Sequence, residues 1–208
     1  MISIVDYGLG NVQAFLNVYK RLNIEALPAS NASDLSGATK VILPGVGAFD
    51  HAMERLDQSG MRETLDDLVL NKHVPVLGVC VGMQILAHGS DEGTLQGLKW
   101  IPGRVRHLSA LGAAEDLRLP HMGWNDVAPT NDSPLFKKLE SDARFYFLHS
   151  YYFECDESAD VAATSSYGAD FSCAVRGTGV HDNIFGVQFH PEKSHHFGTQ
   201  LLQNFAEL

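Results

Sequence analysis

Cysteine is scarce in this sequence, and long apolar runs are missing. The three cysteines, Cys80, Cys155 and Cys173, are odd in number and lie far apart. Disulfide frameworks and zinc modules use paired or closely spaced cysteines, so we expect neither, and the pattern suits a reducing compartment. No run of about 18 apolar residues occurs, and the first residues lack the basic and apolar segments of an export signal. We therefore expect a cytoplasmic protein without a membrane span.

Positive charge is also in short supply. The chain has 15 Lys and Arg against 25 Asp and Glu, which gives a formal net charge of −10. The field of such a chain repels phosphate backbones, which argues against nucleic-acid binding through a general basic surface. The chain has 208 residues, of which 45% are apolar and 19% charged. This composition is typical of a globular protein, and we expect one domain over residues 1–208.

The first half of the chain alternates short apolar runs with stretches of helical spacing, which is the pattern of βαβ units. Strands are expected at 1–5, 40–43 and 74–79, and helices at 11–22, 48–56 and 61–70. Later strands are expected at 145–148, 159–165, 172–175 and 184–189, before a closing helix at about 197–206. The expected fold is α/β, with a central, mostly parallel sheet flanked by helices and with additional antiparallel strands.

The sharpest local motif is an apolar strand that runs into Gly78-Val79-Cys80-Val81-Gly82 and then into a predicted helix. A nucleophile on a tight strand-to-helix turn needs small residues two positions to either side, and Gly78 and Gly82 meet that need. A helix N-terminus at Cys80 favours the thiolate, and the amide of Val81 can face an oxyanion. A structural cysteine between packing glycines is the competing interpretation, and the preceding strand favours the functional one. Cys155 and Cys173 lack such a turn and are interpreted as packing residues.

A second motif, His190-Pro191-Glu192, follows the strand predicted at 184–189. A thiol nucleophile needs an imidazole to take its proton, and the imidazole needs a carboxylate or amide to fix its tautomer. Pro191 restricts the backbone, so both side chains leave the strand end with little freedom. We expect His190 to act as the base and Glu192 as the carboxylate that orients it.

Two further patterns lead to no site. His190, His195 and His196 could suggest a metal, but no cysteine stands at ligand spacing and no second histidine cluster completes the set. The segment Gly8–Gly10 could suggest a nucleotide loop, but Gln13 stands where the fingerprint needs its third glycine. We therefore expect neither a metal nor a cofactor.

The motifs around Cys80 and His190 together resemble those of the class I glutamine amidotransferases. Other segments are similar to one branch of that family, the glutaminase subunits of imidazole glycerol phosphate synthase. These segments are Asp6-Tyr7-Gly8-Leu9-Gly10-Asn11, Pro44-Gly45-Val46-Gly47, Pro120-His121-Met122-Gly123-Trp124-Asn125, His149-Ser150-Tyr151 and Pro191-Glu192-Lys193-Ser194. The likeness spans nearly the whole chain, with the motifs in the family's order. Val81 stands where the family often has leucine, which leaves the chemistry intact because only its backbone is needed.

The resemblance implies a Cys-His-Glu triad in which Cys80 attacks the carboxamide of glutamine, His190 transfers protons and Glu192 steadies the imidazolium. It also implies an oxyanion site and a substrate site around this triad. The oxyanion residues are Gly45, Val46 and Val81, and the substrate residues are Gly47, Gln84, Ser150 and Tyr151.

The resemblance further implies a partner. Members of this branch form a heterodimer with a (β/α)8-barrel synthase subunit, which uses their ammonia to make imidazole glycerol phosphate and AICAR in histidine biosynthesis. Asn11, Trp124 and Lys193 match positions at that interface, although a core aromatic is a competing interpretation of Trp124.

Other functions stay open. Relatives serve other acceptors, such as enzymes that amidate the sugars of surface polysaccharides, and a stand-alone γ-glutamyl hydrolase would share the nucleophile turn and the histidine. A catalytically silent binding module carries little weight, because it would have no reason to keep Cys80, His190 and Glu192 together.

Overall fold

The computed structural model describes residues 1–112, 118–130, 133–139 and 142–208. Its main element is an eight-stranded sheet with the strand order β2-β1-β3-β4-β13-β12-β11-β8. The first five strands are parallel: β2 (Ala26–Ala29), β1 (Ile2–Val5), β3 (Lys40–Gly45), β4 (Val76–Cys80) and β13 (Ile184–Val187). The last three continue it antiparallel: β12 (Ala169–Arg176), β11 (Val161–Tyr167) and β8 (Ala128–Pro129). The predicted α/β fold with a mostly parallel sheet and added antiparallel strands is confirmed.

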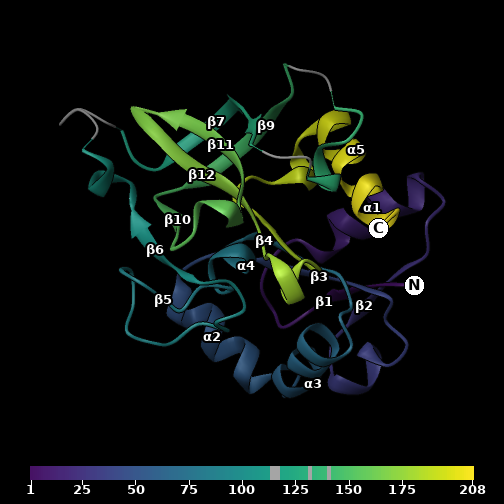
Figure 1. The fold of residues 1–208 in the computed structure, drawn as a ribbon. Coiled ribbons are helices and arrows are strands. Elements are labelled where there is room, and N and C mark those ends of the chain that lie inside the picture. The colour runs from purple at the N-terminus through teal and green to yellow at the C-terminus, as the bar shows by residue number, and fades with distance from the viewer. Residues whose placement is uncertain (113–117, 131–132, 140–141) are drawn as a thin grey trace.

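Helices lie against both faces of the parallel part (Figure 1). They are α1 (Val12–Arg21), α2 (Phe49–Gln58), α3 (Arg62–Asp66), α4 (Val81–Gln84) and α5 (His195–Ala206). Figure 1 shows α1 and α5 together on one side and α2 and α3 on the other. Helix α1 begins where Asn11 Oδ1 accepts a hydrogen bond from the amide of Ala14 at 3.1 Å, which satisfies one of the free amides of the first turn.

Two helical predictions need correction. The helix expected at 61–70 is α3 followed by a π-helical turn, η2 (Asp67–Asn71). The helix expected after Cys80 is the single turn α4, because the carbonyls of Ile85 and Leu86 accept hydrogen bonds from the amides of Leu98 and Trp100 instead of continuing the helix. Neither hydrogen bond can be deduced from local periodicity, since each joins distant residues.

Two smaller sheets border the main one. One contains β10 (Tyr151–Cys155), β6 (Gly103–His107) and β5 (Gly89–Ser90), and the other pairs β7 (His121–Asp126) with β9 (Arg144–His149). The sequence predicted β9 and missed β2, β5, β6, β7, β8 and β10 as defined strands, most of which are short or carry polar residues.

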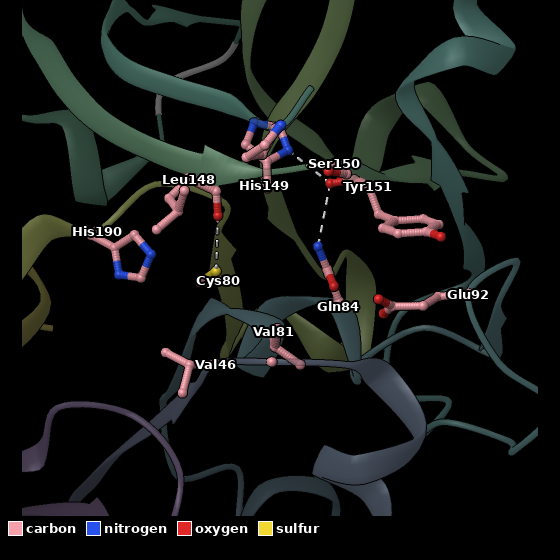
Figure 2. Close-up of a pocket in the computed structure, with 12 residues that line it drawn as sticks. Val46, Cys80, Val81, Gln84, Glu92, Leu148, His149, Ser150, Tyr151 and His190 are labelled. Atoms are coloured by element: carbon pink, nitrogen blue, oxygen red, sulfur yellow. Dashed lines mark hydrogen bonds between the residues drawn. The ribbon is translucent and has the colours of Figure 1, made fainter. Parts of the chain in front are cut away.

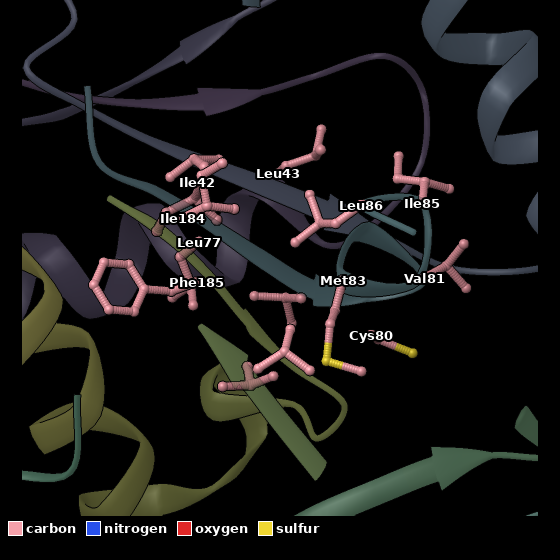
Figure 3. Close-up of a cluster of buried hydrophobic side chains, with 14 of the residues drawn as sticks. Ile42, Leu43, Leu77, Cys80, Val81, Met83, Ile85, Leu86, Ile184 and Phe185 are labelled. Carbon is pink, nitrogen blue, oxygen red and sulfur yellow. The ribbon is translucent and has the colours of Figure 1, made fainter. Parts of the chain in front are cut away.

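The position of β13 brings the segment before His190 beside the strand that ends at Cys80. It pairs with β4 in parallel, with Gly186 opposite Gly78 and Val187 opposite Val79. The residues that follow both strands therefore arrive at the same, carboxyl, edge of the sheet. Figure 3 shows apolar side chains of β3, β4, α4 and β13 packed together beside Cys80, including Leu43, Met83 and Ile184. This buried cluster fixes the position of the turn that carries the cysteine.

Candidate active site

Cys80 lies on a strained turn between β4 and α4. Its backbone has φ +56° and ψ −115°, and positive φ is unfavourable for a residue with a Cβ atom. A Cβ on Gly82 would collide with the backbone carbonyl of Leu43, and one on Gly78 would collide with the carbonyl of Gly82. The two glycines therefore provide the room that the sequence motif predicts. Such strain persists only where the surrounding packing determines it, and it holds the sulfur at the mouth of a cavity.

The sulfur of Cys80 has two polar neighbours besides the imidazole. Its thiol faces the carbonyl of Leu148 at 4.0 Å, and Nε2 of Gln188 points to it at 3.8 Å. Cys80 is 5% exposed, so these contacts act in a largely water-free environment. Cys173 is fully buried and Cys155 partly so, and burial raises the pKa of both thiols, that of Cys155 to about 12. Neither is poised to be a nucleophile at neutral pH, in agreement with their interpretation as packing residues.

His190 and Glu192 form a buried pair behind the sulfur. Nδ1 of His190 lies 2.9 Å from Oε1 of Glu192, and both side chains are less than 5% exposed. Burial alone lowers the pKa of His190, but hydrogen bonds and charge interactions with Cys80 and Glu192 outweigh this and raise the pKa to about 9. The hydroxyl of Ser194 donates to the carbonyl of His190 at 2.6 Å, and the amide of His190 donates to the carbonyl of Tyr146 at 2.9 Å. The imidazole is thus held by its ring nitrogen and by its backbone.

The segment Pro44–Gly47 spans the end of β3 and the turn that follows it, beside Cys80. The phenol of buried Tyr7 donates to the Pro44 carbonyl at 2.7 Å and anchors the start of the segment. Gly45 packs against the amide of Gly82, where a side chain would collide. Gly47 has φ +90° and no atom near the place of a Cβ, while Val46 is 41% exposed. The two peptides after Gly45 therefore have more space than the anchored Pro44.

A cavity of about 270 Å³ joins these elements (Figure 2). It is lined by Val46, Gly47, Cys80, Val81, Gln84, Glu92, Pro120, Leu148, His149, Ser150, Tyr151 and His190. The structure thus brings together Cys80, His190 and six further predicted site residues. Glu192 lies behind His190, and Gly45 lies below the cavity in β3. The volume suits a ligand of the size of an amino acid.

Sequence reasoning missed three polar side chains of the site. Glu92 lines the cavity, and its Oε2 accepts a hydrogen bond from the amide of Phe49 at 2.8 Å. Gln188 contacts the sulfur, and His149 lines the cavity and lies above Cys80 and Gln84 in Figure 2. Glu92 stands in a polar turn with no motif. The only signal for Gln188 is its place two residues before His190. His149 belongs to the motif His149-Ser150-Tyr151, but no role of its own was predicted for it from the sequence.

The predicted interface residues lie outside the cavity. Trp124 is 40% exposed on β7, so it is not a core aromatic, and it stacks on His195 with 5.0 Å between ring centroids. The ammonium of Lys193 lies 5.8 Å from the centre of the Tyr146 ring, which in turn meets Trp124 edge-on. Asn11 caps α1, which packs against η7 (Pro191–Lys193).

The histidines that could have suggested a metal do not converge. His195 stacks on Trp124 and His196 on Phe197, whereas His190 is paired with Glu192. In the part of the chain that the structure describes, no three His, Cys, Asp or Glu side chains are grouped to hold a metal ion. Among the same residues, no helix is both long and apolar enough to cross a membrane.

Comparisons with known proteins agree with the geometry. The sequence model of the family "Glutamine amidotransferase class-I" matches residues 3–208. "Imidazole glycerol phosphate synthase subunit HisH" of Bdellovibrio bacteriovorus is 61% identical over 208 residues, and the protein of the same name from Leptospira interrogans is 53% identical, with each match covering 100% of both chains.

Solved structures show the same fold at low identity. A structure described as "Crystal structure of glutamine amidotransferase" has a TM-score of 0.75 and 20% identity and covers 99% of this chain and 97% of its own. "Structure of PurLQS from Thermotoga maritima" has a TM-score of 0.74 and 15% identity, with the same coverage.

Proposed function

Because the chain belongs to the class I glutamine amidotransferase family, we propose that it is the glutaminase subunit of imidazole glycerol phosphate synthase and acts in histidine biosynthesis. As a member of the family it is a glutamine amidotransferase, and the relatives at 53% and 61% identity carry the name of that subunit. The observation that carries the mechanism is the strained Cys80 beside a histidine that is paired with a buried glutamate.

In the proposed reaction, the thiolate of Cys80 attacks the carboxamide carbon of glutamine. Because Nδ1 of His190 faces Glu192, Nε2 is the nitrogen that serves the sulfur and the leaving amine. The imidazolium protonates the departing nitrogen, ammonia leaves, and a glutamyl thioester remains. His190 then takes a proton from water, whose oxygen attacks the thioester, and the products are glutamate and the regenerated thiolate.

Two groups of residues serve this chemistry. The amides of Val46 and Val81 receive the oxyanion, and Gly45 and Gly47 allow the Val46 peptide to turn toward it. Gly47, Gln84, Ser150 and Tyr151 hold the amino and carboxylate groups of the substrate.

Glu92 adds a feature that no motif indicates. Its carboxylate lines the cavity on the side of Gln84 and Tyr151 in Figure 2, away from the sulfur. Glutamine carries its ammonium group at the end opposite to the reacting carboxamide. A negative charge at this place complements that ammonium, and we assign Glu92 to its recognition.

The acceptor of the ammonia is a (β/α)8-barrel synthase subunit that forms a heterodimer with this chain. The docking face that we propose is the exposed side of β7 and β9 with Met122, Trp124 and Leu148, which are 65%, 40% and 38% exposed. Apolar side chains this exposed and this close together are typical of interaction surfaces. Leu148 also lines the cavity, so the face adjoins the active site. Ammonia passes from here to the barrel, which makes imidazole glycerol phosphate and AICAR.

The mechanism is tested by the release of glutamate from glutamine in the presence of the barrel subunit. Cys80→Ala is expected to lose at least about a thousandfold in turnover, because removal of the nucleophile leaves only binding and oxyanion contacts. Cys173→Ala, which removes a buried thiol outside the cavity, is the matched control and should retain turnover. Turnover that survives in Cys80→Ala would rule out the proposed nucleophile.

A further inference from the structure

The carbonyl oxygen of Tyr151 sets the direction of a buried hydrogen-bond network. Two side chains point to it, Nδ1 of His149 at 2.8 Å and Nε2 of Gln84 at 3.3 Å. A carbonyl oxygen can only accept hydrogen bonds, so both nitrogens must carry the hydrogen. This fixes the tautomer of His149 and the orientation of the Gln84 amide, which are otherwise ambiguous.

The first arm of the network leads from Gln84 to the nucleophile. Nε2 of Gln84 also lies 3.0 Å from the side-chain amide of Gln188. Since Nε2 of Gln84 is a donor, the atom of Gln188 that faces it must be the oxygen Oε1. The nitrogen of Gln188 is then left to face the sulfur of Cys80 at 3.8 Å. Gln84 and Gln188 are 3% and 0% exposed, so water does not compete for these contacts.

The second arm leads from His149 toward β7. Because Nδ1 of His149 donates, its Nε2 accepts from Nδ1 of His121 at 2.9 Å, and Nε2 of His121 accepts from the amide of Asn125 at 3.3 Å. The same Asn125 nitrogen donates to the carbonyl of Ser166 at 2.8 Å. Burial lowers the pKa of His149 to about 3 and that of His121 to about 4, which agrees with two neutral rings. An extra proton on either ring would place two donors face to face.

We propose that Gln188 is a positioning residue whose Nε2–H donates to the sulfur of Cys80 and stabilises its thiolate. The carbonyl of Tyr151 fixes the orientation of the Gln84 amide, and Gln84 in turn fixes which atom of Gln188 faces the sulfur. The inference rests on the proposed role of Cys80 as the nucleophile. A donor aimed at sulfur favours the charged form of a thiol, whereas an acceptor at the same place disfavours it.

The test measures the rate at which iodoacetamide alkylates Cys80, assigned by mass spectrometry, as a function of pH. Gln188→Met removes the donor. Gln188→Glu keeps an oxygen for Gln84 and, when ionised, presents only acceptor oxygens to the sulfur. Both variants should alkylate about tenfold more slowly at neutral pH, with the profile moved by about one unit to higher pH. Gln13→Met, an exposed glutamine on α1, is the control and should match the wild type.

Profiles of Gln188→Met and Gln188→Glu that are both identical to that of the wild type would overturn the proposal, because Gln188→Met has no hydrogen-bond donor to offer the sulfur. A second measurement needs no variant. In the wild type, the side-chain amide protons of Gln188 should titrate in NMR spectra with the midpoint of the Cys80 alkylation profile, and amide protons that do not respond would also overturn it. Alkylation requires no glutamine turnover. A chain without glutaminase activity but with the Gln188 dependence would therefore refute the proposed function alone.

Discussion

At the scale of single residues, the candidate active site depends on backbone positions that tolerate almost no side chain. Cys80 has a positive φ, and Gly82 lies directly against the carbonyl of Leu43. The unfavourable free energy of this strained turn is offset by the favourable packing of the strands on both sides of β4. A side chain added at a crowded glycine such as Gly82 should therefore destabilise the protein by steric overlap. One added at an exposed turn glycine should cost only the strain of its backbone conformation.

Gly82→Ala is expected to destabilise the protein by about 2–4 kcal/mol, because the added methyl would overlap a backbone carbonyl that cannot move aside. The free energy of unfolding by urea measures this. Gly37→Ala is the matched control, since Gly37 has φ +81° and open space around it. It should cost only about 1 kcal/mol, from the left-handed backbone alone. Equal losses in the two variants would show that crowding at Gly82 is unimportant.

The paired histidine predicts a dependence of stability on pH. The pKa of His190 is raised to about 9, so the folded protein holds this proton more tightly than the unfolded chain does. The resulting stabilisation is complete below about pH 6.5 and is lost as the pH rises through about 9. His190→Gln should therefore show a smaller decrease in the free energy of unfolding between pH 6.5 and 9.5 than the wild type. Parallel decreases would mean that this pKa is not raised in the folded state.

The sequence could locate Cys80, His190 and Glu192 because their chemistry leaves local marks. A nucleophile turn needs its glycines within two residues, and a histidine with its carboxylate can lie on one short turn. Glu92 and Gln188 carry no such mark, since each acquires its contact only when separate elements meet. The network around the Tyr151 carbonyl could be deduced only from the structure for the same reason.

At the scale of elements, helix α2 is held at its first turn by the loop that supplies Glu92. Ala48, its N-cap, has no side chain to cap it, and Glu92 accepts the hydrogen bond of the Phe49 amide instead. In return, the carboxylate of Asp50 accepts from the amides of Thr94 and Leu95 at 2.9 and 3.1 Å. These hydrogen bonds join Phe49 and Asp50 to the loop 92–95. Because Phe49 stands two residues after Gly47, they fix the end of the segment that carries Val46.

Asp50→Ala should lower the free energy of unfolding by about 1–2 kcal/mol, since it leaves loop amides without their charged acceptor. Glutaminase turnover should decrease as well, because the end of the Val46 segment is released. Glu54→Ala, an exposed change on the same helix, should alter neither quantity. If Asp50→Ala behaves like Glu54→Ala in both assays, the hydrogen bonds of Asp50 contribute neither to stability nor to turnover.

Hydrophobic periodicity predicted the longer helices but not where specific hydrogen bonds end or distort a helix. Helices α1, α2 and α5 begin within about two residues of the predicted positions, because each has an apolar face with helical spacing. The single turn α4 and the π-helical turn η2 depart from the prediction. The end of α4 is set by residues farther along the chain, such as the amide of Leu98 on the carbonyl of Ile85, whereas η2 is closed locally by the hydrogen bond from the amide of Lys72 to the carbonyl of Asp67.

At the scale of the whole molecule, the candidate active site lies at the carboxyl edge of the parallel strands, where α/β folds commonly bind their ligands. The sequence predicted β4 and β13 separately, and their adjacency is what joins Cys80 to His190. Local patterns say nothing about strand order, so this juxtaposition was expected only from the resemblance to the family. The exposed side of β7 and β9 continues from the cavity onto the surface through Leu148.

In the proposed complex, a partner that covers Met122 and Trp124 would be placed to influence the candidate site. The proposed docking face lies on β7, whose residues His121 and Asn125 also belong to the network that ends at the sulfur of Cys80. A partner bound at this face therefore lies near both the nucleophile and the exposed Val46.

Glutamine turnover of the purified chain, measured with and without the barrel subunit and its ribonucleotide ligand, tests the central claim most directly. We predict slow turnover by the chain alone and an increase of at least about tenfold when partner and ligand are both present, within the range of coupling between distinct sites. Turnover that is the same with and without the barrel subunit would contradict the account and would point to another acceptor or to a hydrolase that acts alone.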